Sequence, residues 1–537
     1  MYYFIVRCYV IEGGRQYHPI FKREVGIMNK IWKALTPLLI ITLFSATSCV
    51  PATPLAPRPA HPNIIFILTD DMAATDLAYM PRTIKLIQNQ GISFDKFFVS
   101  ISLCCPSRTS LLRGQYAQNT KVTDNALPYG GFDRVYQLGL ENSMLPDWLK
   151  QAGYRTALFG KYLNFYPGLA GKTYIPPGWD EWASPVDGFP YTEFNYTLNE
   201  NGKLVKYGNT PQDYETDVLS SLSLKFINNS LNQNQPFFVY IATYAPHHPY
   251  TPAPRHAGMY NTLSLPKPPS FNEADMSDKK GTLLWKYPLT DNQINDLQTD
   301  YRLRMESLQA VDEMVGKVVD TLSAAGKLND TYIFFTSDNG YHLGQHRLPA
   351  GKNTPYEEDI LVPFLVSGPD IRSGGHVKEL TGNIDIAPTI ADLAGATIPN
   401  FVDGRSLTSF LFGQSVTQWR QAYLLQRALI PAGEKDNDSV EESDVSGEPS
   451  GLIEPSDSPY DNVPMAYNGL RTQQYTYLEF YNGVVQIYDL NKDPYELNNF
   501  FKTADPTLLA KLHSWLKELE NCAADSCRSA EINPQFP

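Results

Sequence analysis

Two adjacent cysteines precede a proline at the start of a helical pattern that runs to Gly114. Pro106 suits the first turn of a helix, because the N–H group it lacks would have no partner there. Cys104 and Cys105 are therefore expected near a helix N-terminus, where free N–H groups and the helix dipole favour an anion. Such a position would suit a covalent nucleophile. The alternative interpretation is a buried thiol pair with a structural role.

Acidic side chains follow two apolar runs of the kind that form buried strands. Asp70 and Asp71 come after residues 64–68, and Asp338 and Asn339 follow a second run. In open α/β sheets the working groups collect where strands end. Hard oxygen ligands of this kind suit Ca²⁺ or Mg²⁺. A single Asp–Asp pair is more often a capped turn, but two such groups on either side of the cysteine motif favour a metal site.

Three basic side chains are candidates for binding an anionic group, and two of them follow apolar runs. Lys161 follows residues 156–159, His247 follows residues 237–242, and Lys352 lies in a Gly-Lys-Asn sequence. Each has an ordinary alternative, because lysines are usually solvated and a single histidine is usually structural. Together they would concentrate positive charge for an anionic substrate group.

The cysteine segment resembles the motif of the sulfatase family, Cys-x-Pro-Ser-Arg followed a few residues later by Gly. In this chain Cys104 is the first position, Cys105 the variable one, and Arg108 and Gly114 complete the pattern. The resemblance covers residues 62–527 apart from an acidic segment. The other matching segments are 338–345, 383–389 and 403–407.

The resemblance implies a maturation step at Cys104. In this family a formylglycine-generating enzyme oxidises the first cysteine of the motif to formylglycine during export. The hydrated aldehyde carries two hydroxyls on one carbon, so one can attack sulfur and expel the alcohol. The other then loses its proton, and collapse to the aldehyde ejects sulfate. A serine or cysteine would instead be left as a sulfated residue that is hard to hydrolyse.

The family pattern also implies roles for individual positions. The implied ligands of the divalent cation, most often Ca²⁺, are Asp70, Asp71, Asp338, Asn339 and the formylglycine at Cys104. Arg108 is expected to steady the formylglycine and His247 to protonate the leaving alcohol. Lys161 and Lys352 are expected to bind sulfate oxygens. His342 is a further candidate for the pocket lining, ranked below His247 together with His248 and His346.

One position departs from many family members, which carry a histidine two residues after the first lysine. Here Leu163 occupies that position and Asn164 follows it. Asn164 is expected to take a polar role in substrate binding, but an amide cannot accept a proton near neutral pH. The base that triggers sulfate release is therefore left open. The sequence Gly-Lys-Tyr-Leu-Asn resembles the branch of N-acetylglucosamine-6-sulfatases and microbial or algal arylsulfatases.

The working groups require a sheet whose strand ends meet. Strands are predicted at residues 64–68, 237–242, 332–335 and 363–366, and helices at 80–90, 145–152 and 301–324. Continuous apolar runs that alternate with helical patterns indicate an α/β fold with a large central, mostly parallel sheet flanked by helices. The resemblance implies the alkaline-phosphatase-like version of this fold. A smaller C-terminal subdomain with an antiparallel sheet is predicted at 467–489, with a last helix at 506–520.

The chain is expected to begin with segments that are not part of the fold. Residues 28–49 combine a basic start, an apolar stretch and small residues, as in an export signal. Cys49 after those small residues resembles a lipidation site, with simple cleavage as the alternative. Residues 1–27 are interpreted as a non-native upstream extension, and residues 50–61 as a Pro-rich tether.

The remaining chain is expected to contain three parts. Residues 62–431 form the catalytic domain, 432–462 an acidic mobile insertion, and 463–530 the small C-terminal subdomain. Cys522 and Cys527 are close enough in sequence for a short-loop disulfide, as an oxidising compartment would permit. The expected location is periplasmic or extracellular, with a membrane attachment only through a lipid on Cys49.

Composition narrows the function classes. A net charge of -13 argues against general affinity for nucleic acid. Three hypotheses follow: hydrolysis of an aryl sulfate or of a sugar sulfate such as N-acetylglucosamine 6-sulfate; a phosphoester or phosphonate hydrolase; and a non-catalytic glycan-binding protein. The last is expected to have lost some of Cys104, Asp70, Asp338 and Lys352, all of which are present.

The choice between a sugar and an aryl substrate stays open. Tyrosine-rich loops at 191–196 and 244–260 could stack on sugar rings or on aryl groups equally well.

Overall fold

The computed structural model describes residues 58–233, 235–279, 287–428 and 466–532. All of them belong to one compact unit of the chain. The expected upstream extension 1–27, export signal 28–49 with Cys49, most of the tether 50–61, and the acidic segment 432–462 lie outside the described residues. Within the described ranges, no helix combines the length and apolar character needed to span a membrane.

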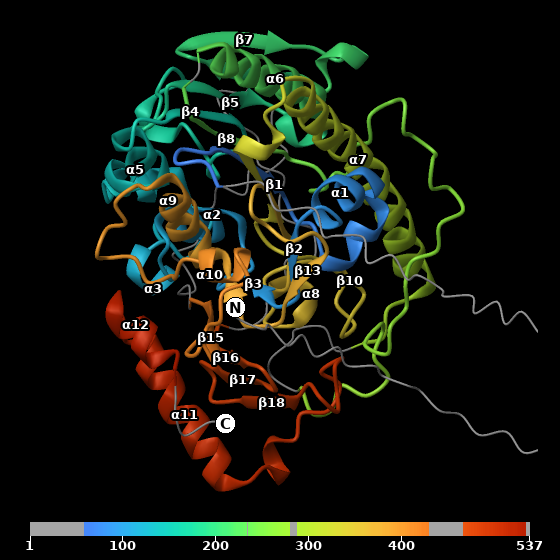
Figure 1. The fold of residues 1–537 in the computed structure, drawn as a ribbon. Coiled ribbons are helices and arrows are strands. Elements are labelled where there is room, and N and C mark those ends of the chain that lie inside the picture. Colours follow the sequence, from blue (N-terminus) through green and yellow to red (C-terminus); the bar gives the residue numbers. More distant parts are fainter. Residues whose placement is uncertain (1–57, 234, 280–286, 429–465, 533–537) are drawn as a thin grey trace, which may run out of the picture. The chain divides into compact units, whose positions relative to one another are not determined.

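A ten-stranded sheet forms the centre of this unit, with helices on both of its faces (Figure 1). Its strands, in spatial order, are β13 (Gly375–Val377), β2 (Ile92–Phe94), β12 (Phe364–Ser367), β9 (Thr331–Ser337), β1 (Asn63–Thr69), β8 (Phe237–Ala242), β4 (Arg155–Gly160), β5 (Glu181–Gly188), β6 (Tyr196–Glu200) and β7 (Lys203–Tyr207). The central strands β9, β1, β8, β4 and β5 run parallel. Strands β12, β6 and β7 pair antiparallel with their neighbours. The predicted α/β class with a large, mostly parallel sheet is confirmed.

The apolar runs form strands because both faces of the sheet are covered. Side chains alternate between the two faces of a strand. In β1, Phe66 and Leu68 pack in one core, and Ile65 and Ile67 pack in the other. The first core includes side chains of α2 (Cys104–Arg113), α5 (Leu145–Gln151) and α9 (Ile386–Ala394). The second includes side chains of α6 (Glu215–Gln233) and α7 (Asp291–Ala324).

Two predicted helices differ from the structure in their extent. The pattern at 80–90 forms a short helix, α1 (Pro81–Thr83), that continues as a single π-helical turn, η2 (Ile84–Gln88). Helix α7 begins at Asp291 rather than at 301. Its polar first turns carry little apolar periodicity, and the start is set by Thr290, whose hydroxyl accepts a hydrogen bond from the Gln293 N–H. The capping residue, rather than the apolar pattern, marks this boundary.

A separate four-stranded antiparallel sheet is formed by β15 (Ala422–Arg427), β16 (Tyr467–Thr472), β17 (Tyr475–Phe480) and β18 (Val485–Asp489). Helix α11 (Pro506–Glu520) packs on it through Leu512, Trp515 and Leu516. The predicted small antiparallel sheet is thereby confirmed, and its first strand comes from the range 62–431. A disulfide joins Cys522 to Cys527 between α11 and α12 (Asp525–Ala530).

Candidate active site

The sheet brings four polar groups together at the carboxyl ends of neighbouring strands. Asp338 follows β9, Asp70 follows β1, His247 follows β8, and Lys161 follows β4. The strand ends are fixed to one another by the backbone: the Asp338 N–H donates to the Thr69 carbonyl (3.1 Å) and the Lys161 N–H to the Ala242 carbonyl (2.9 Å). Residues far apart in sequence thus converge on one edge of the sheet.

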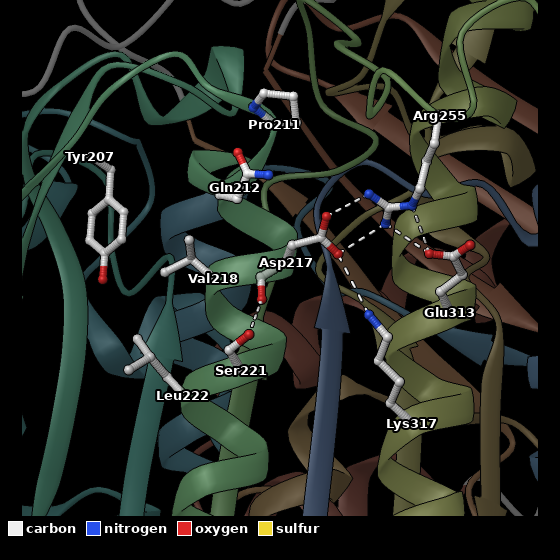
Figure 2. Close-up of a pocket in the computed structure, with 10 residues that line it drawn as sticks. All are labelled: Tyr207, Pro211, Gln212, Asp217, Val218, Ser221, Leu222, Arg255, Glu313 and Lys317. Carbon is white, nitrogen blue, oxygen red and sulfur yellow. Dashed lines mark hydrogen bonds and ion pairs between the residues drawn. The ribbon is translucent and has the colours of Figure 1, made fainter.

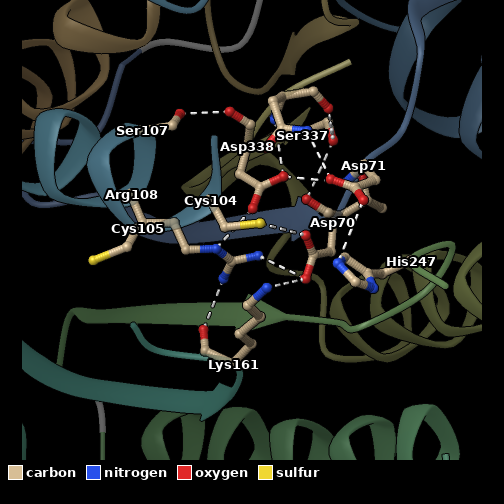
Figure 3. A network of polar contacts seen from close by, with 12 residues as sticks. Asp70, Asp71, Cys104, Cys105, Ser107, Arg108, Lys161, His247, Ser337 and Asp338 are labelled. Carbon is tan, nitrogen blue, oxygen red and sulfur yellow. Dashed lines mark hydrogen bonds and ion pairs between the residues drawn. The ribbon is translucent and has the colours of Figure 1, made fainter. Parts of the chain in front are cut away.

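Cys104 is the first residue of α2 and points into this group (Figure 3). Its Sγ lies 3.4 Å from Asp70 Oδ1 and 2.9 Å from the Lys352 ammonium. The thiol is completely buried. The helix N-terminus, a carboxylate and an ammonium therefore surround the side chain at this position.

Three carboxylates and one amide form the acidic part of the site. Asp338 Oδ1 accepts from the backbone N–H groups of Asp71 (3.1 Å) and Asn339 (2.8 Å). Asp71 Oδ1 accepts from Asn339 Nδ2 (2.7 Å) and from Lys352 Nζ (2.9 Å). Asp71 itself has a positive φ of 65°, a strained conformation for a residue with a side chain. The backbone is thus bent to bring both Asp70 and Asp71 to the same point.

These residues fit a hard divalent cation. Ligand atoms of Asp70, Asp71, Cys104 and His247 all lie within 4.8 Å of one another. Asn339 Oδ1 is buried and has no hydrogen-bond partner among the described residues, although its own amide nitrogen contacts Asp71. An orphaned amide oxygen beside a carboxylate cluster is what an oxygen-seeking ion such as Ca²⁺ or Mg²⁺ requires.

The basic part of the site balances these carboxylates. Arg108 Nε contacts Asp338 Oδ2 (2.8 Å), and Arg108 Nη1 donates to the Lys161 carbonyl (2.9 Å). Lys161 Nζ lies 2.5 Å from Asp70 Oδ2. Counting Lys352, three fixed cations meet three carboxylates, so a bound divalent cation would leave the pocket positive and suited to an anionic substrate.

Burial and charge act against each other on the titratable groups. Burial disfavours the Asp70 carboxylate, but Lys161, His247 and Arg108 outweigh this effect and lower its pKa. Burial and the neighbouring Asp70 raise the pKa of Asp338. Burial and Asp70 also raise the pKa of the Cys104 thiol well above its usual value, so the unmodified, cation-free thiol is protonated and a poor nucleophile.

His247 has a defined orientation. Its Nδ1 lies 2.7 Å from the His248 carbonyl, which can only accept, so Nδ1 carries a proton. Its Nε2 faces the site, 3.5 Å from Asp71 Oδ2. Tyr191 packs against the imidazole with ring centroids 4.6 Å apart and also lies 4.9 Å from Lys161 Nζ. The ring is therefore positioned to exchange a proton through Nε2.

Several supporting residues were not singled out from the sequence. Ser107 donates its hydroxyl to the Asp338 carbonyl and accepts from Asn383 Nδ2 (2.9 Å). Arg304 on α7 donates to the Asp71 carbonyl (2.6 Å) and forms an ion pair with Asp76 (3.0 Å). The hydrogen bond from Arg304 thus holds the strained Asp71 backbone in place. Ser107 and Asn383 both lie in segments that match the family pattern, so the sequence could have indicated their role. Arg304 lies inside an amphipathic helix, and no local sequence pattern indicates its role.

Two further sequence candidates are buried in segments that adjoin site residues along the chain or across a strand pair. His342 is buried on β10 (His342–Leu343), where Asp359 holds its Nδ1 at 2.9 Å, and it pairs in register with Gly351, next to Lys352. Asn164 is buried in the segment after β4, and its carbonyl accepts from the Phe132 N–H (2.8 Å). Their roles in substrate binding stay predictions.

Gly160 allows Lys161 to leave its strand. Its φ is 109°, and a Cβ there would lie 1.9 Å from the Ala242 carbonyl oxygen, which accepts the Lys161 N–H. We expect Gly160→Ala to lower the free energy of unfolding by at least about 3 kcal/mol, measured by urea denaturation. Gly153→Ala is the matched control, because Gly153 also has a positive φ (86°) but open space around it. Its cost should be only about 1–2 kcal/mol, and equal losses in both variants would contradict this role of Gly160.

A hollow of ≈ 560 Å³ lies beside α6 and α7, away from the residues described above (Figure 2). Its charged side chains are paired with one another: Arg255 contacts Asp217 (2.6 Å) and Glu313 (2.8 Å). None of the motif residues lines it. Because its charges are satisfied internally, it is not a site built to bind an anionic ester.

The fold and the site define a hydrolase of anionic esters that is suited to use a metal ion. The sulfatase family model matches residues 62–396. The human N-acetylglucosamine-6-sulfatase is 36% identical over 93% of this chain and 91% of its own length. The arylsulfatase of Volvox carteri is 32% identical over 87% of this chain and 76% of its own length. The chain therefore belongs to the sulfatase family and is an enzyme of the sulfuric ester hydrolase class.

Solved structures agree with the alkaline-phosphatase-like fold. A protein in complex with its substrate D-glucosamine-2-N,6-O-disulfate has a TM-score of 0.69 and 24% identity, covering 87% of this chain and 98% of that one. The phosphonate monoester hydrolase of Silicibacter pomeroyi has a TM-score of 0.64 and 22% identity, covering 85% of this chain and 94% of that one. At these identities the likeness concerns the fold.

Proposed function

We propose that this enzyme hydrolyses the sulfate ester of a sugar, using formylglycine at position 104 as the nucleophile and a divalent cation as its partner. The observation that carries the proposal is the position of Cys104, at a helix N-terminus between the Asp70 carboxylate and the Lys352 ammonium. A protonated, buried thiol is a poor choice for attack on sulfur. A hydrated aldehyde at the same position would have the required hydroxyl groups.

Asp70, Asp71, Asp338 and Asn339 would hold the cation, and Ca²⁺ is the ion that we propose. When bound, it would offset negative charge on the nucleophile and the sulfate group. Arg304 supports this site indirectly, since it holds the Asp71 backbone through its carbonyl (2.6 Å). The Ser107 hydroxyl likewise holds the Asp338 backbone by donating to its carbonyl.

The basic residues would hold the substrate. Lys161 and Lys352 flank the position of the nucleophile, each 2.5–2.9 Å from a carboxylate of the site, and can turn toward sulfate oxygens. Arg108, buried between Asp70 and Asp338, would fix the nucleophile and the two carboxylates relative to each other. These contacts favour the sulfate group over an uncharged ester.

The reaction would proceed in two steps. One hydroxyl of the hydrated residue 104 would lose its proton to a carboxylate of the site and attack sulfur, the sulfur–oxygen bond to the sugar would break, and the alcohol would leave with the Nε2 proton of a doubly protonated His247. The second hydroxyl would then lose its proton to Nε2 of His247, which faces the site, the carbon–oxygen bond to sulfate would break, and the aldehyde would re-form. Water restores the hydrate.

The substrate that we propose is a glucosamine-type sugar with a 6-sulfate. Two lines of support agree: the human N-acetylglucosamine-6-sulfatase aligns over most of both chains, and one solved structural neighbour holds its substrate D-glucosamine-2-N,6-O-disulfate. The alternative is an aryl sulfate, which the similarity to the Volvox arylsulfatase supports. A phosphonate monoester is a third candidate, supported by fold similarity alone.

Maturation and location follow from the same proposal. Residue 104 would require a formylglycine-generating enzyme, and export would place the chain in the oxidising compartment that its disulfide suits. A relative from Caenorhabditis elegans carries the name of a putative extracellular sulfatase homologue. Attachment to a membrane through Cys49 remains part of this proposal.

A substrate panel tests the proposed function. We expect N-acetylglucosamine 6-sulfate to give a kcat/KM at least about 100-fold above that of its 3-sulfate isomer and of a phenyl phosphonate monoester. Nitrophenyl sulfate should react, since an activated leaving group needs little acid catalysis. Faster hydrolysis of the phosphonate than of every sulfate would contradict the proposal, and faster hydrolysis of the aryl sulfate alone would move the substrate to the aryl class.

A further inference from the structure

A second cluster of side chains of the types that can bind a metal lies outside the active site. It consists of His346, Glu358 and Glu496, whose ligand atoms all lie within 4.8 Å of one another. His346 is in the loop between β10 and β11 (Ala350–Gly351), Glu358 is on α8 (Glu357–Ile360), and Glu496 follows β18. The cluster therefore joins the catalytic part of the chain to the segment that follows the small antiparallel sheet.

His346 is oriented in the way that metal-binding histidines usually are. Its Nδ1 lies 2.7 Å from Glu273 Oε2, and Lys279 holds the other oxygen of that carboxylate at 2.9 Å. A carboxylate that accepts the Nδ1 proton leaves the Nε2 lone pair for a metal. Tyr356 packs on the imidazole with ring centroids 4.1 Å apart, which further fixes the ring.

Two of the three side chains, His346 and Glu496, are buried and each has an atom without a hydrogen-bond partner among the described residues. Within the described part of the chain, His346 Nε2 and Glu496 Oε1 have no hydrogen-bond partner, and both side chains are 1% exposed. The second oxygen of Glu496 is held by the Glu357 N–H (3.1 Å), so Oε1 stays directed at the cluster. Glu358 Oε1 accepts a long hydrogen bond from the Ser270 hydroxyl (3.3 Å).

The spacing suits an ion rather than direct contacts. Ligands that each lie about 2.1 Å from a metal are separated by at most about 4.2 Å. The observed limit of 4.8 Å is a little wider, so small side-chain movements would complete the site. The chemistry of the groups agrees, because two carboxylates and one imidazole face one another here and a dication would offset the carboxylate charge.

We propose that His346, Glu358 and Glu496 bind a structural transition-metal dication of the Zn²⁺ type, separate from the active-site cation. An imidazole ligand disfavours Ca²⁺ and Mg²⁺, which take oxygen ligands, and favours zinc. Three protein ligands leave a fourth position for water.

The expected effect is on the loop that carries Lys352. β10 and β11 form a hairpin with His342 paired to Gly351, and Lys352 follows it directly. At its tip His346 and Arg347 both have positive φ, 51° and 60°, and the Arg347 side chain donates to the Glu273 and Ala274 carbonyls. A metal at His346 would fasten this strained tip to Glu496 and so fix the position of Lys352.

The test measures metal content rather than turnover. The full chain is stripped with a chelator, reloaded with Ca²⁺, then dialysed against Zn²⁺ and analysed by mass spectrometry for metals. We expect about one zinc per chain in the wild type, and a zinc affinity at least about 100-fold weaker in Glu358→Gln and His346→Gln. Co²⁺ in place of zinc should give visible absorbance in the wild type and none in these variants.

Two controls make the outcome specific. His376→Gln removes an exposed histidine that also pairs with a carboxylate, Asp95 (2.8 Å), and should keep the zinc. Asp71→Asn removes an active-site ligand and should keep it as well. Zinc that is absent from the wild type, or that survives both cluster variants, overturns the proposal. Zinc lost only in Asp71→Asn assigns it to the active site and equally overturns the proposal.

Discussion

Cys104→Ala should lower kcat for sulfate ester hydrolysis by at least about 10⁴-fold, because it removes the atom from which the nucleophile is made. The side chain lies on a scaffold fixed by strand ends and by α2, so the free energy of unfolding should change by no more than about 1 kcal/mol. Steady-state kinetics and urea denaturation of the same preparation measure the two effects.

The neighbouring cysteine supplies the control. Cys105 is equally buried but packs in the hydrophobic core of the sheet. Cys105→Ala should cost about 1–2 kcal/mol of stability and keep most of the activity. Cys104→Ser should release at most one equivalent of alcohol per chain, since a sulfated serine has no second hydroxyl to eject sulfate. Full turnover in either Cys104 variant would contradict the formylglycine mechanism.

Asp71→Asn should abolish the response of the enzyme to Ca²⁺. Asp71 contacts Asn339, Lys352 and His247, so its charge lies at the centre of the proposed cation site. In the wild type, Ca²⁺ at 100 times its dissociation constant should stabilise the fold by about 2.7 kcal/mol. In the variant this stabilisation should disappear at the same Ca²⁺ concentration, and kcat/KM should fall by at least about 10³-fold. Thermal denaturation with and without Ca²⁺ measures the first effect.

Asp312→Asn is the matched control for this experiment. Asp312 is a buried carboxylate that accepts from the Thr83 N–H (2.7 Å) and the Arg82 N–H (3.0 Å), far from the motif segments in sequence. Its loss should cost about 1–3 kcal/mol of stability with and without Ca²⁺ alike. A Ca²⁺ response that survives Asp71→Asn would show that the cation does not depend on this cluster.

The sequence predicted the core of the site because its residues follow recognisable strands. Asp70, Lys161, His247 and Asp338 each come after an apolar run, and parallel strands place their carboxyl ends at one edge. The convergence of these four residues is a consequence of the strand order β9-β1-β8-β4. That order could not be derived from the runs alone, since their sequence order is different.

Other features depend on contacts between distant segments that have no local pattern. Arg304 reaches Asp71 from inside a long amphipathic helix, where an arginine is ordinarily a surface residue. β15 and β16 pair although the acidic segment separates them in sequence, so composition alone could not predict where the small sheet begins. His346 and Glu496 meet only because the β10–β11 hairpin contacts the segment after β18. Such contacts are set by tertiary packing and not by periodicity.

The most direct test of this account is peptide mass spectrometry of the fragment that contains residue 104, from active enzyme purified from its native host. Formylglycine should appear as a loss of about 18 Da relative to the cysteine peptide, while Cys105 in the same peptide stays unmodified. The fraction converted should rise in proportion to specific activity across preparations. An unmodified thiol at residue 104 in fully active protein would contradict the proposed nucleophile and return the phosphonate hydrolase alternative to consideration.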